Sequence, residues 1–245
     1  MINNLYEIIE IPFDIEEEDV WEVMGTKGRV VSELQNELTQ AINEVRELSA
    51  PRAIYNNIPV EKITSKEVHI SSSTVIQNKF AAHLFQGARE AILVVATIGP
   101  RIDRRISQLA KEGNNIEAII MDAVGTVVSF NTFTYVLDLL QSDTISRGWK
   151  MGTCLNPGQT YWDITGQSII FDLLPVKRIG VKLLETSFMK PQKSQSGIIP
   201  IGNALIITRD PSESSCKYCQ AIRCPLRIEP FNGFNNNEII AERMH

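Results

Sequence analysis

The fold class is decided by one stretch of the sequence, "EAILVVATIGPRIDRRISQLAKEGNNIEAIIMDAVGTVVSFNTFTYVLDLLQ", residues 90–141. Residues 90–99 form a β-branched, apolar run closed by a glycine, which predicts a buried strand. Pro100 suits the first turn of a helix, and we expect that helix over about 101–112. Residues 115–141 carry apolar side chains on more than one side of a helix, so they predict a long helix that is largely buried.

Two further helices are expected before this stretch. Within residues 16–50, apolar side chains recur at helical spacing. Gly25 and Gly28 separate this segment into two helices. Pro51 ends the second of them.

The remaining segments mix strands and helices. The run "KEVHI" (66–70) predicts a short strand, and residues 71–85 predict a helix capped by serine or threonine. Residues 163–174 predict another helix, with Asp163 or Thr165 as its N-cap. Three strands are then expected, at 178–186, 196–202 and 203–210. Because strands and helices do not alternate in a clean βαβ pattern, the α+β class is favoured.

The composition excludes several classes of protein. The 245 residues are 43% hydrophobic and 22% charged, with a net charge of −5, whereas a nucleic-acid binder needs a basic face. No uninterrupted apolar run reaches the roughly eighteen residues of a membrane span, so no membrane is expected. The N-terminal residues are acidic and lack the basic start of a signal peptide. We therefore expect a cytoplasmic protein, in which cysteines do not form disulfides.

Three cysteines near the C-terminus are spaced as metal ligands. Cys216, Cys219 and Cys224 form a C-x2-C-x4-C pattern, and Cys154 is a candidate fourth ligand. Such a set of thiolates fits Zn²⁺ or an iron–sulfur cluster. The alternative is that they are reduced free thiols.

Two other segments carry candidate binding groups. The corner "NPGQTYWD" (156–163) offers Tyr161 or Trp162 for stacking on an aromatic ligand; the alternative is a rigid turn whose aromatic side chains fill the core. The segment "MKPQKSQSGIIPIG" (189–202) offers a cation, two hydroxyls and a glycine, which could hold a carboxylate or phosphate. Its alternative is a polar turn between strands.

Taken together, these segments resemble one family, the activation (reactivation) domain of cobalamin-dependent methionine synthase in its stand-alone bacterial form. "DAVGT" (122–126) is similar to the family's "DA-hydrophobic-GS", and "NPGQTYWDITGQSIIFDLL" (156–174) to its "SPGY…W…Q…LF…LL". "IGVKLLETSFMKPQKSQSGIIPIG" (179–202) is similar to its "IGV-L-ES-M-P-KSVSGI-GI", and the cysteine pattern followed by Arg227 also matches. The resemblance covers about residues 20–227.

The resemblance implies an α+β, C-shaped fold around a twisted antiparallel sheet flanked by helices. It implies a protein that binds S-adenosylmethionine and presents it to the cobalamin of methionine synthase or another corrinoid protein, when that cobalamin has been oxidised to its inactive form. A low-potential donor such as flavodoxin or ferredoxin would supply one electron, and the cobalt would take the methyl group. The protein would supply binding and orientation, because the chemistry belongs to the cofactors.

The resemblance also implies a set of site residues. In the corner, the family's arginine before the turn corresponds to Arg147 at a longer spacing, and Gln159 stands where the family has tyrosine, for which Tyr161 could substitute. Phe130 stands near the family's usual glutamate. The expected ligand-binding residues are Arg147, Asn156, Pro157, Gly158, Gln159, Tyr161, Lys193, Ser194, Ser196 and Gly197. We expect the corner at 153–162 to form one wall of a cleft, with a loop at 193–197 opposite.

The losses at Gln159 and Phe130 keep a second hypothesis open. In it, the chain is a non-catalytic partner of a corrinoid protein, or a cysteine-cluster redox protein, that has lost S-adenosylmethionine binding. Either hypothesis implies the same organisation: a domain at 1–210 whose helical part spans about 16–50, a cysteine-rich motif at 211–230 and a flexible tail at 231–245.

Overall fold

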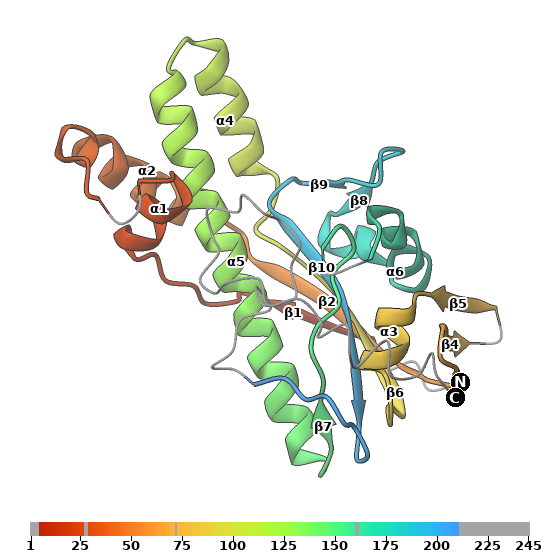
Figure 1. The fold of residues 1–245 in the computed structure, drawn as a ribbon. Coiled ribbons are helices and arrows are strands. Elements are labelled where there is room, and N and C mark those ends of the chain that lie inside the picture. The colour runs from red at the N-terminus through yellow and green to blue at the C-terminus, as the bar shows by residue number, and fades with distance from the viewer. Residues whose placement is uncertain (1–4, 27–28, 72, 160–161, 211–245) are drawn as a thin grey trace.

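The centre of the fold is a five-stranded antiparallel sheet, seen in a computed structural model that describes residues 5–26, 29–71, 73–159 and 162–210 (Figure 1). The strand order is β1-β2-β6-β10-β7, and every neighbouring pair is antiparallel. Its strands are β1 (Leu5–Ile9), β2 (Arg52–Pro59), β6 (Glu90–Thr97), β7 (Lys150–Met151) and β10 (Ser194–Gly202). Two small antiparallel sheets flank it, made of β3 (Lys62–Ile63), β4 (Glu67–Ser71) and β5 (Thr74–Gln77), and of β8 (Lys182–Leu183) and β9 (Met189–Lys190).

Helices cover both faces of the central sheet. The 32-residue helix α5 (Asn115–Ser146) runs across one face and continues beyond it (Figure 1). The helices α3 (Lys79–Leu84) and α6 (Gln167–Leu173) lie on the other face. The helices α1 (Glu17–Val23), α2 (Gln35–Leu48) and α4 (Arg101–Lys111) pack on the part of α5 that extends past the sheet. Three short 3₁₀ turns complete the described elements: η1 (Ser32–Leu34), η2 (Ile164–Gly166) and η3 (Val176–Ile179).

The core has three parts, which follow from this layering. One cluster fills the space between the sheet and α5, and it includes Val94 of β6 and Val136 of α5. A second lies on the opposite face of the sheet, around Phe85 and Ile198. A third joins α1, α2 and α4 to α5, with Trp21 buried at its centre. Because α5 contributes to two of the three clusters, it needs apolar side chains on several sides, as its sequence shows.

The main sequence predictions are confirmed. The apolar run at 90–99 forms β6, whose last seven residues are all buried between the two layers. The helices expected at about 101–112 and 115–141 are α4 and α5, and α5 runs five residues further than predicted. The segment 16–50 contains α1 and α2 with a break between them. The chain therefore has the α+β fold that its sequence predicts.

Three local predictions were wrong. Residues 71–85 are not one serine-capped helix, because β5 occupies the first part and α3 begins only after Asn78, whose side chain accepts a hydrogen bond from the Ala81 amide at 2.9 Å. Residues 178–186 contain only a two-residue strand after a 3₁₀ turn. Residues 203–210, predicted as a strand, adopt neither helix nor strand. In each case the tertiary environment overrides the local preference of the segment.

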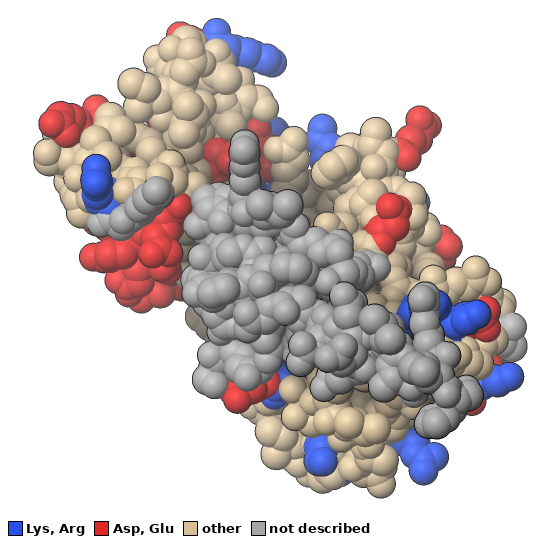
Figure 2. Space-filling model, in the orientation of Figure 1, with Lys and Arg blue, Asp and Glu red and all other residues tan. Residues whose placement is uncertain are grey.

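Helix α5 is long and apolar enough to cross a membrane by length and composition alone. In this fold, however, 61% of its most apolar window is buried inside the protein, as in the core helix of a globular domain. On the face shown in Figure 2, Lys and Arg side chains of the described residues are scattered, without a continuous basic area. Acidic side chains gather near the start of α1, where Glu17, Glu18 and Asp19 form the first turn.

Candidate functional site

The corner that follows β7 is fastened directly to β10. Leu155 and Ile198 form an isolated antiparallel bridge, in which each backbone amide donates to the other residue's carbonyl at 2.9 and 3.0 Å. Gly158 then turns the chain with a φ of 85°, in the left-handed region that favours glycine. Its amide donates to the Trp162 carbonyl at 2.8 Å, which closes the turn. Backbone hydrogen bonds therefore fix the corner at Leu155 and at Gly158, where the Pro-Gly sequence predicts a turn.

Trp162 fixes the far end of this corner. Its side chain is 93% buried, and its ring lies so close to Gly166 that a Cβ at that position would collide with it. Asp163, which follows, accepts hydrogen bonds from the hydroxyl and the amide of Thr165 at 2.7 and 2.9 Å, and so caps η2. These bonds lower the pKa of Asp163. The Trp162 side chain therefore fills the core, which was one of the two alternatives for the aromatic residues of this corner. Tyr161 lies outside the described residues.

Asn156 ties the corner to the middle of β10. Its side-chain Nδ2 donates to the Ser196 carbonyl at 2.7 Å. The same side chain also forms a hydrogen bond with the Cys154 thiol. Gly197 makes room for this arrangement, since a Cβ there would lie 3.2 Å from the Asn156 Nδ2 and would collide with the Cys154 Sγ.

Cys154 is a buried, reduced thiol. Burial raises its pKa to about 12, although the charge of Arg209 and a hydrogen bond from Asn156 act in the opposite direction. A thiolate is the form that binds metal, so loss of the Cys154 proton is unfavourable in this environment. The described residues contain no group of three His, Cys, Asp or Glu side chains that could hold a metal ion. Cys216, Cys219 and Cys224 lie outside the described residues, so the proposed cluster stays a prediction.

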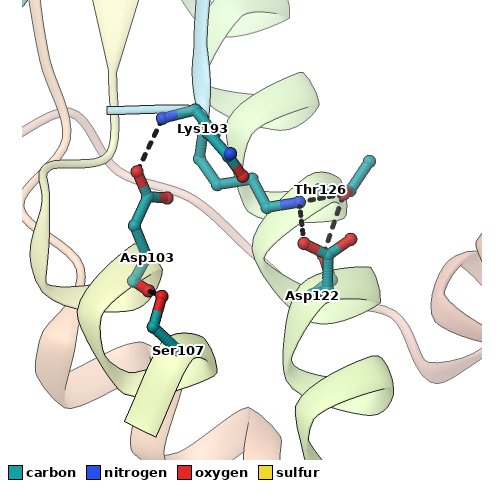
Figure 3. Close-up of polar contacts among 6 residues, drawn as sticks. Asp103, Ser107, Asp122, Thr126 and Lys193 are labelled. Atoms are coloured by element: carbon teal, nitrogen blue, oxygen red, sulfur yellow. Dashed lines mark hydrogen bonds and ion pairs between the residues drawn. The ribbon is translucent and has the colours of Figure 1, made fainter. Parts of the chain in front are cut away.

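Lys193 reaches from the start of β10 toward Asp122 and Thr126 of α5 (Figure 3). Its Nζ lies 2.8 Å from the Asp122 carboxylate and 2.8 Å from the Thr126 hydroxyl. Its side chain is only 11% exposed, whereas Asp122 is 50% exposed. The preceding residue, Gln192, donates its amide to Asp103 of α4 at 2.7 Å. The start of β10 is thus held to both helices by charged groups.

The "KSQSG" run is a strand rather than the loop that we expected. Ser194 is buried and donates to the Thr97 hydroxyl or the Pro191 carbonyl, at 2.9 and 2.8 Å. Ser196 is buried on the same face and its hydroxyl donates to the Gln167 Oε1 of α6 at 2.7 Å. Gln195 points the other way and donates to the Ser129 carbonyl of α5 at 3.0 Å. Polar side chains that alternate along β10 therefore connect the sheet to the helix layers on both of its faces.

Two arginines near this end of the sheet, Arg147 and Arg209, have different partners. The Arg147 Nη2 donates to both carboxylate oxygens of Glu90 at 3.1 Å, and its guanidinium lies 4.3 Å from the centre of the Trp149 ring. Glu90 pairs with Ile201 of β10, which is three residues from Ile198, the β10 residue of the corner bridge. The Glu90 partner of Arg147 is thus about 10 Å along the strand from the corner. Arg209 is nearer the corner.

Arg209 could not be found from the sequence, because its partners lie 58 to 71 residues earlier in the chain. Its amide donates to the Met151 carbonyl at 2.8 Å. Its guanidinium bonds to the Gln141 side chain, and to Asp138 at 2.7 Å. It is therefore the cation whose charge acts on Cys154.

Two positions where the sequence departs from the resembling family are on the surface. Gln159 is exposed at the corner, and Phe130 on α5 is 49% exposed. Pro157, beside Asn156, is buried and stiffens the turn. The corner, the middle of β10 and the facing part of α5 together form the candidate functional site.

Comparison with known proteins gives one structural match of note. The chain is similar to the crystal structure of the MetH reactivation domain bound to AdoHcy, with a TM-score of 0.61 and 14% sequence identity. The match covers 84% of this chain and 80% of that one. No family model matches the sequence, and no curated protein matches it by sequence. The two proteins therefore share a fold.

Proposed function

We propose that this chain is an S-adenosylmethionine-binding accessory protein for the reductive reactivation of a cobalamin-dependent methionine synthase or a related corrinoid protein. The fold supports the proposal, because the similar reactivation domain was crystallised with AdoHcy, the demethylated product of S-adenosylmethionine. The sequence motifs of the resembling family support it independently.

One observation carries the proposal: the segment at the start of β10 contacts two other motifs that are far from it in the sequence. The "DAVGT" motif of α5 contacts the "KSQSG" motif of β10 through Asp122 and Lys193, which are 71 residues apart. The Pro-Gly corner contacts the same motif through Asn156 and the Ser196 carbonyl, which are 40 residues apart. We infer that a ligand bound beside β10 would contact residues of all three motifs.

The charges at this place suit the proposed ligand. S-adenosylmethionine carries a sulfonium cation, which is stabilised by carboxylates and aromatic faces. Asp122, which is paired with Lys193, presents a half-exposed carboxylate on α5, and Phe130 presents an exposed ring two turns further along. The proposed ligand-binding residues remain those expected from the sequence, and Arg209, whose charge acts on Cys154, is added to them.

The chain's own part in the reaction would be to bind and orient the ligand. A rigid corner and a fixed strand hold the methyl donor in one position, so that less entropy is lost when the partner's corrinoid approaches. S-adenosylmethionine would supply the methyl group and leave as AdoHcy. The corrinoid of the partner would accept the methyl group after a flavodoxin- or ferredoxin-type donor has supplied one electron.

A second function is favoured by a different observation. The polar side chains of Lys193, Ser194 and Ser196 all bond within the protein. These groups hold layers together and are not free to bind a ligand without a rearrangement. The chain could therefore be a non-catalytic corrinoid-protein partner, or a redox protein that uses Cys216, Cys219 and Cys224, on a scaffold that has lost the nucleoside site.

Calorimetric titration separates the two functions. The purified full-length chain is titrated with S-adenosylmethionine and, separately, with AdoHcy. Micromolar binding supports the reactivation role, and transfer of a labelled methyl group to an oxidised corrinoid protein, in the presence of a low-potential reductant, then tests the reaction itself. Absence of binding to protein that is folded by circular dichroism contradicts the reactivation role and favours the second function.

A further inference from the structure

The β8–β9 hairpin places two lysines side by side on its outward face. Lys182 and Lys190 are directly opposite each other in the register of the two strands. Both are exposed, and neither ammonium group has an ion pair within the described part of the chain. Like charges at directly opposite positions destabilise a pair of strands. This arrangement is therefore unfavourable for the chain on its own.

The turn of the hairpin adds two exposed apolar side chains to the same face. The Leu184 amide donates to the Phe188 carbonyl at 2.9 Å, so these residues face each other just beyond the lysine pair. Because side chains alternate along a strand, Leu184 and Phe188 lie on the side of the lysines, whereas Met189 lies on the other side and packs on the core. Leu184 is 39% exposed and Phe188 is 63% exposed. The outward face thus combines an apolar tip with a basic base.

The hairpin is held in a fixed place beside the candidate site. Figure 1 shows its turn pointing away from the rest of the ribbon. At its base, the Gln192 amide donates to Asp103 at 2.7 Å, and the Ser194 hydroxyl lies 2.8 Å from the Pro191 carbonyl. Only residues 191–193 separate β9 from β10. A protein bound to the outward face would therefore lie next to the start of β10.

The charge of this region is opposite in sign to that of the whole chain. Residues 175–192 contain four Lys or Arg and one Glu, although the chain has a net charge of −5. Acidic groups of a partner would relieve the repulsion between Lys182 and Lys190, and an apolar pocket would remove Leu184 and Phe188 from water. Complementary charge guides association and orientation, and buried apolar anchors supply affinity.

We propose that the outward face of the β8–β9 hairpin, formed by Lys182, Leu184, Phe188 and Lys190, is the docking surface for the corrinoid protein. The matching surface of that protein presents acidic side chains around an apolar pocket. The identity of the partner rests on the proposed function. The corrinoid protein is the occupant, rather than the electron donor, because the face adjoins the candidate site from which the methyl group has to be passed on.

The test is a titration with a complete cobalamin-dependent methionine synthase that has no activation domain of its own, loaded with cob(II)alamin. It is titrated with the full-length native chain, with Lys182→Glu and with Phe188→Ser, at low and at high salt. The matched control is Lys150→Glu, which makes the same change of charge at an exposed lysine of β7, paired with Gly202 at the other end of β10.

We expect Lys182→Glu and Phe188→Ser each to lower the affinity about tenfold or more, and Lys150→Glu to leave it within about twofold. The affinity of the native chain should fall as salt rises, and more steeply than that of Lys182→Glu. In the absence of the partner, Lys182→Glu should raise the unfolding midpoint by about 1–3 °C, because an attraction replaces a repulsion. A merely structural role of Lys182 would instead lower stability and affinity together.

Three results would overturn the inference. The first is equal affinity of the native chain and both hairpin variants for the methionine synthase. The second is no binding of the native chain to it. The third is that flavodoxin, or a second copy of this chain, occupies the hairpin face instead. The proposed function is tested separately by binding of S-adenosylmethionine, so a chain that binds this ligand but docks its partner elsewhere keeps the function and loses only the inference.

Discussion

Replacing Lys193 by methionine should destabilise the fold, because Lys193 links β10 to α5. The substitution keeps most of the side-chain stem, which lies against Gly125, where the Lys193 Cε would be 3.4 Å from an added Cβ. It removes the ammonium group, which contacts Asp122 and Thr126 at 2.8 Å each. The change therefore isolates the contribution of the charge (Figure 3).

The expected loss of unfolding free energy is about 2 kcal/mol. Hydrogen bonds to charged groups contribute about 1.5–3 kcal/mol when one partner is buried, as the 11% exposed Lys193 side chain is. The value lies in the lower part of this range because the Asp122 carboxylate is 50% exposed and is screened by solvent. For a chain of this size, that loss corresponds to a fall of about 4–8 °C in the unfolding midpoint.

The assay is equilibrium denaturation in urea, followed by circular dichroism, together with a thermal melt. Lys190→Met is the matched control, because Lys190 is exposed and lies only three residues earlier. It should change the unfolding free energy by less than about 0.5 kcal/mol. A Lys193→Met protein as stable as the Lys190→Met protein would refute the reasoning.

The same variant tests the sequence-based expectation that Lys193 contacts the ligand. At a temperature where Lys193→Met remains folded, its affinity for AdoHcy can be compared with that of the native protein. A lower affinity supports a role in binding besides the structural one, and an equal affinity assigns Lys193 to the fold alone.

Three further outcomes are expected. Gly197→Ala should lower the unfolding free energy by about 2 kcal/mol or more, because the added Cβ collides with Cys154. The double variant Gly197→Ala/Cys154→Ala should recover part of this loss in the same urea assay. No recovery would mean that another neighbour is responsible. Burial raises the pKa of Cys154 to about 12, so its thiol stays protonated in the folded state, whereas it ionises above about pH 9 in the unfolded state. The unfolding free energy should therefore fall between pH 9 and 12 more steeply in the native protein than in Cys154→Ala. Parallel pH profiles of the two proteins would contradict this. The double substitution of Cys216 and Cys219 by serine should abolish bound zinc or iron in protein purified without oxygen, as measured by elemental analysis; unchanged metal content would remove the cluster hypothesis.

The elements that sequence predicts best are those whose local pattern and tertiary environment agree. Residues 115–141 are apolar all round, and the helix that they form is packed on the sheet on one side and on α1, α2 and α4 on others. The β-branched run at 90–99 is similarly buried on both faces. The Pro-Gly turn is predicted correctly because only glycine readily adopts the φ of 85° found at Gly158.

At the start of β10 the sequence prediction fails because polar residues are buried there. Lys193, Ser194 and Ser196 look like a surface loop, because residues of these types are mostly exposed in folded proteins. They are buried here because each finds a partner from a distant element, such as Gln167 for Ser196. Arg209 is likewise held by distant residues, because its partners are 58 to 71 residues earlier in the chain. No local pattern in a sequence reports such pairings.

The position of β10 in the sheet has a consequence for the nascent chain. The strand that lies between β6 and β7 is the last described strand to be synthesised, about 100 residues after β6. Until it emerges from the ribosome, β6 exposes an unpaired edge along "AILVVAT", which has the composition of an aggregation-prone segment. The helices α1 and α2 likewise lack their packing partner α5, which begins about 70 residues after α2 ends. Translation at 5–20 residues per second leaves the edge of β6 unpaired for about 5–20 seconds. Protection by a chaperone during synthesis should therefore affect the yield of this protein more than its final stability.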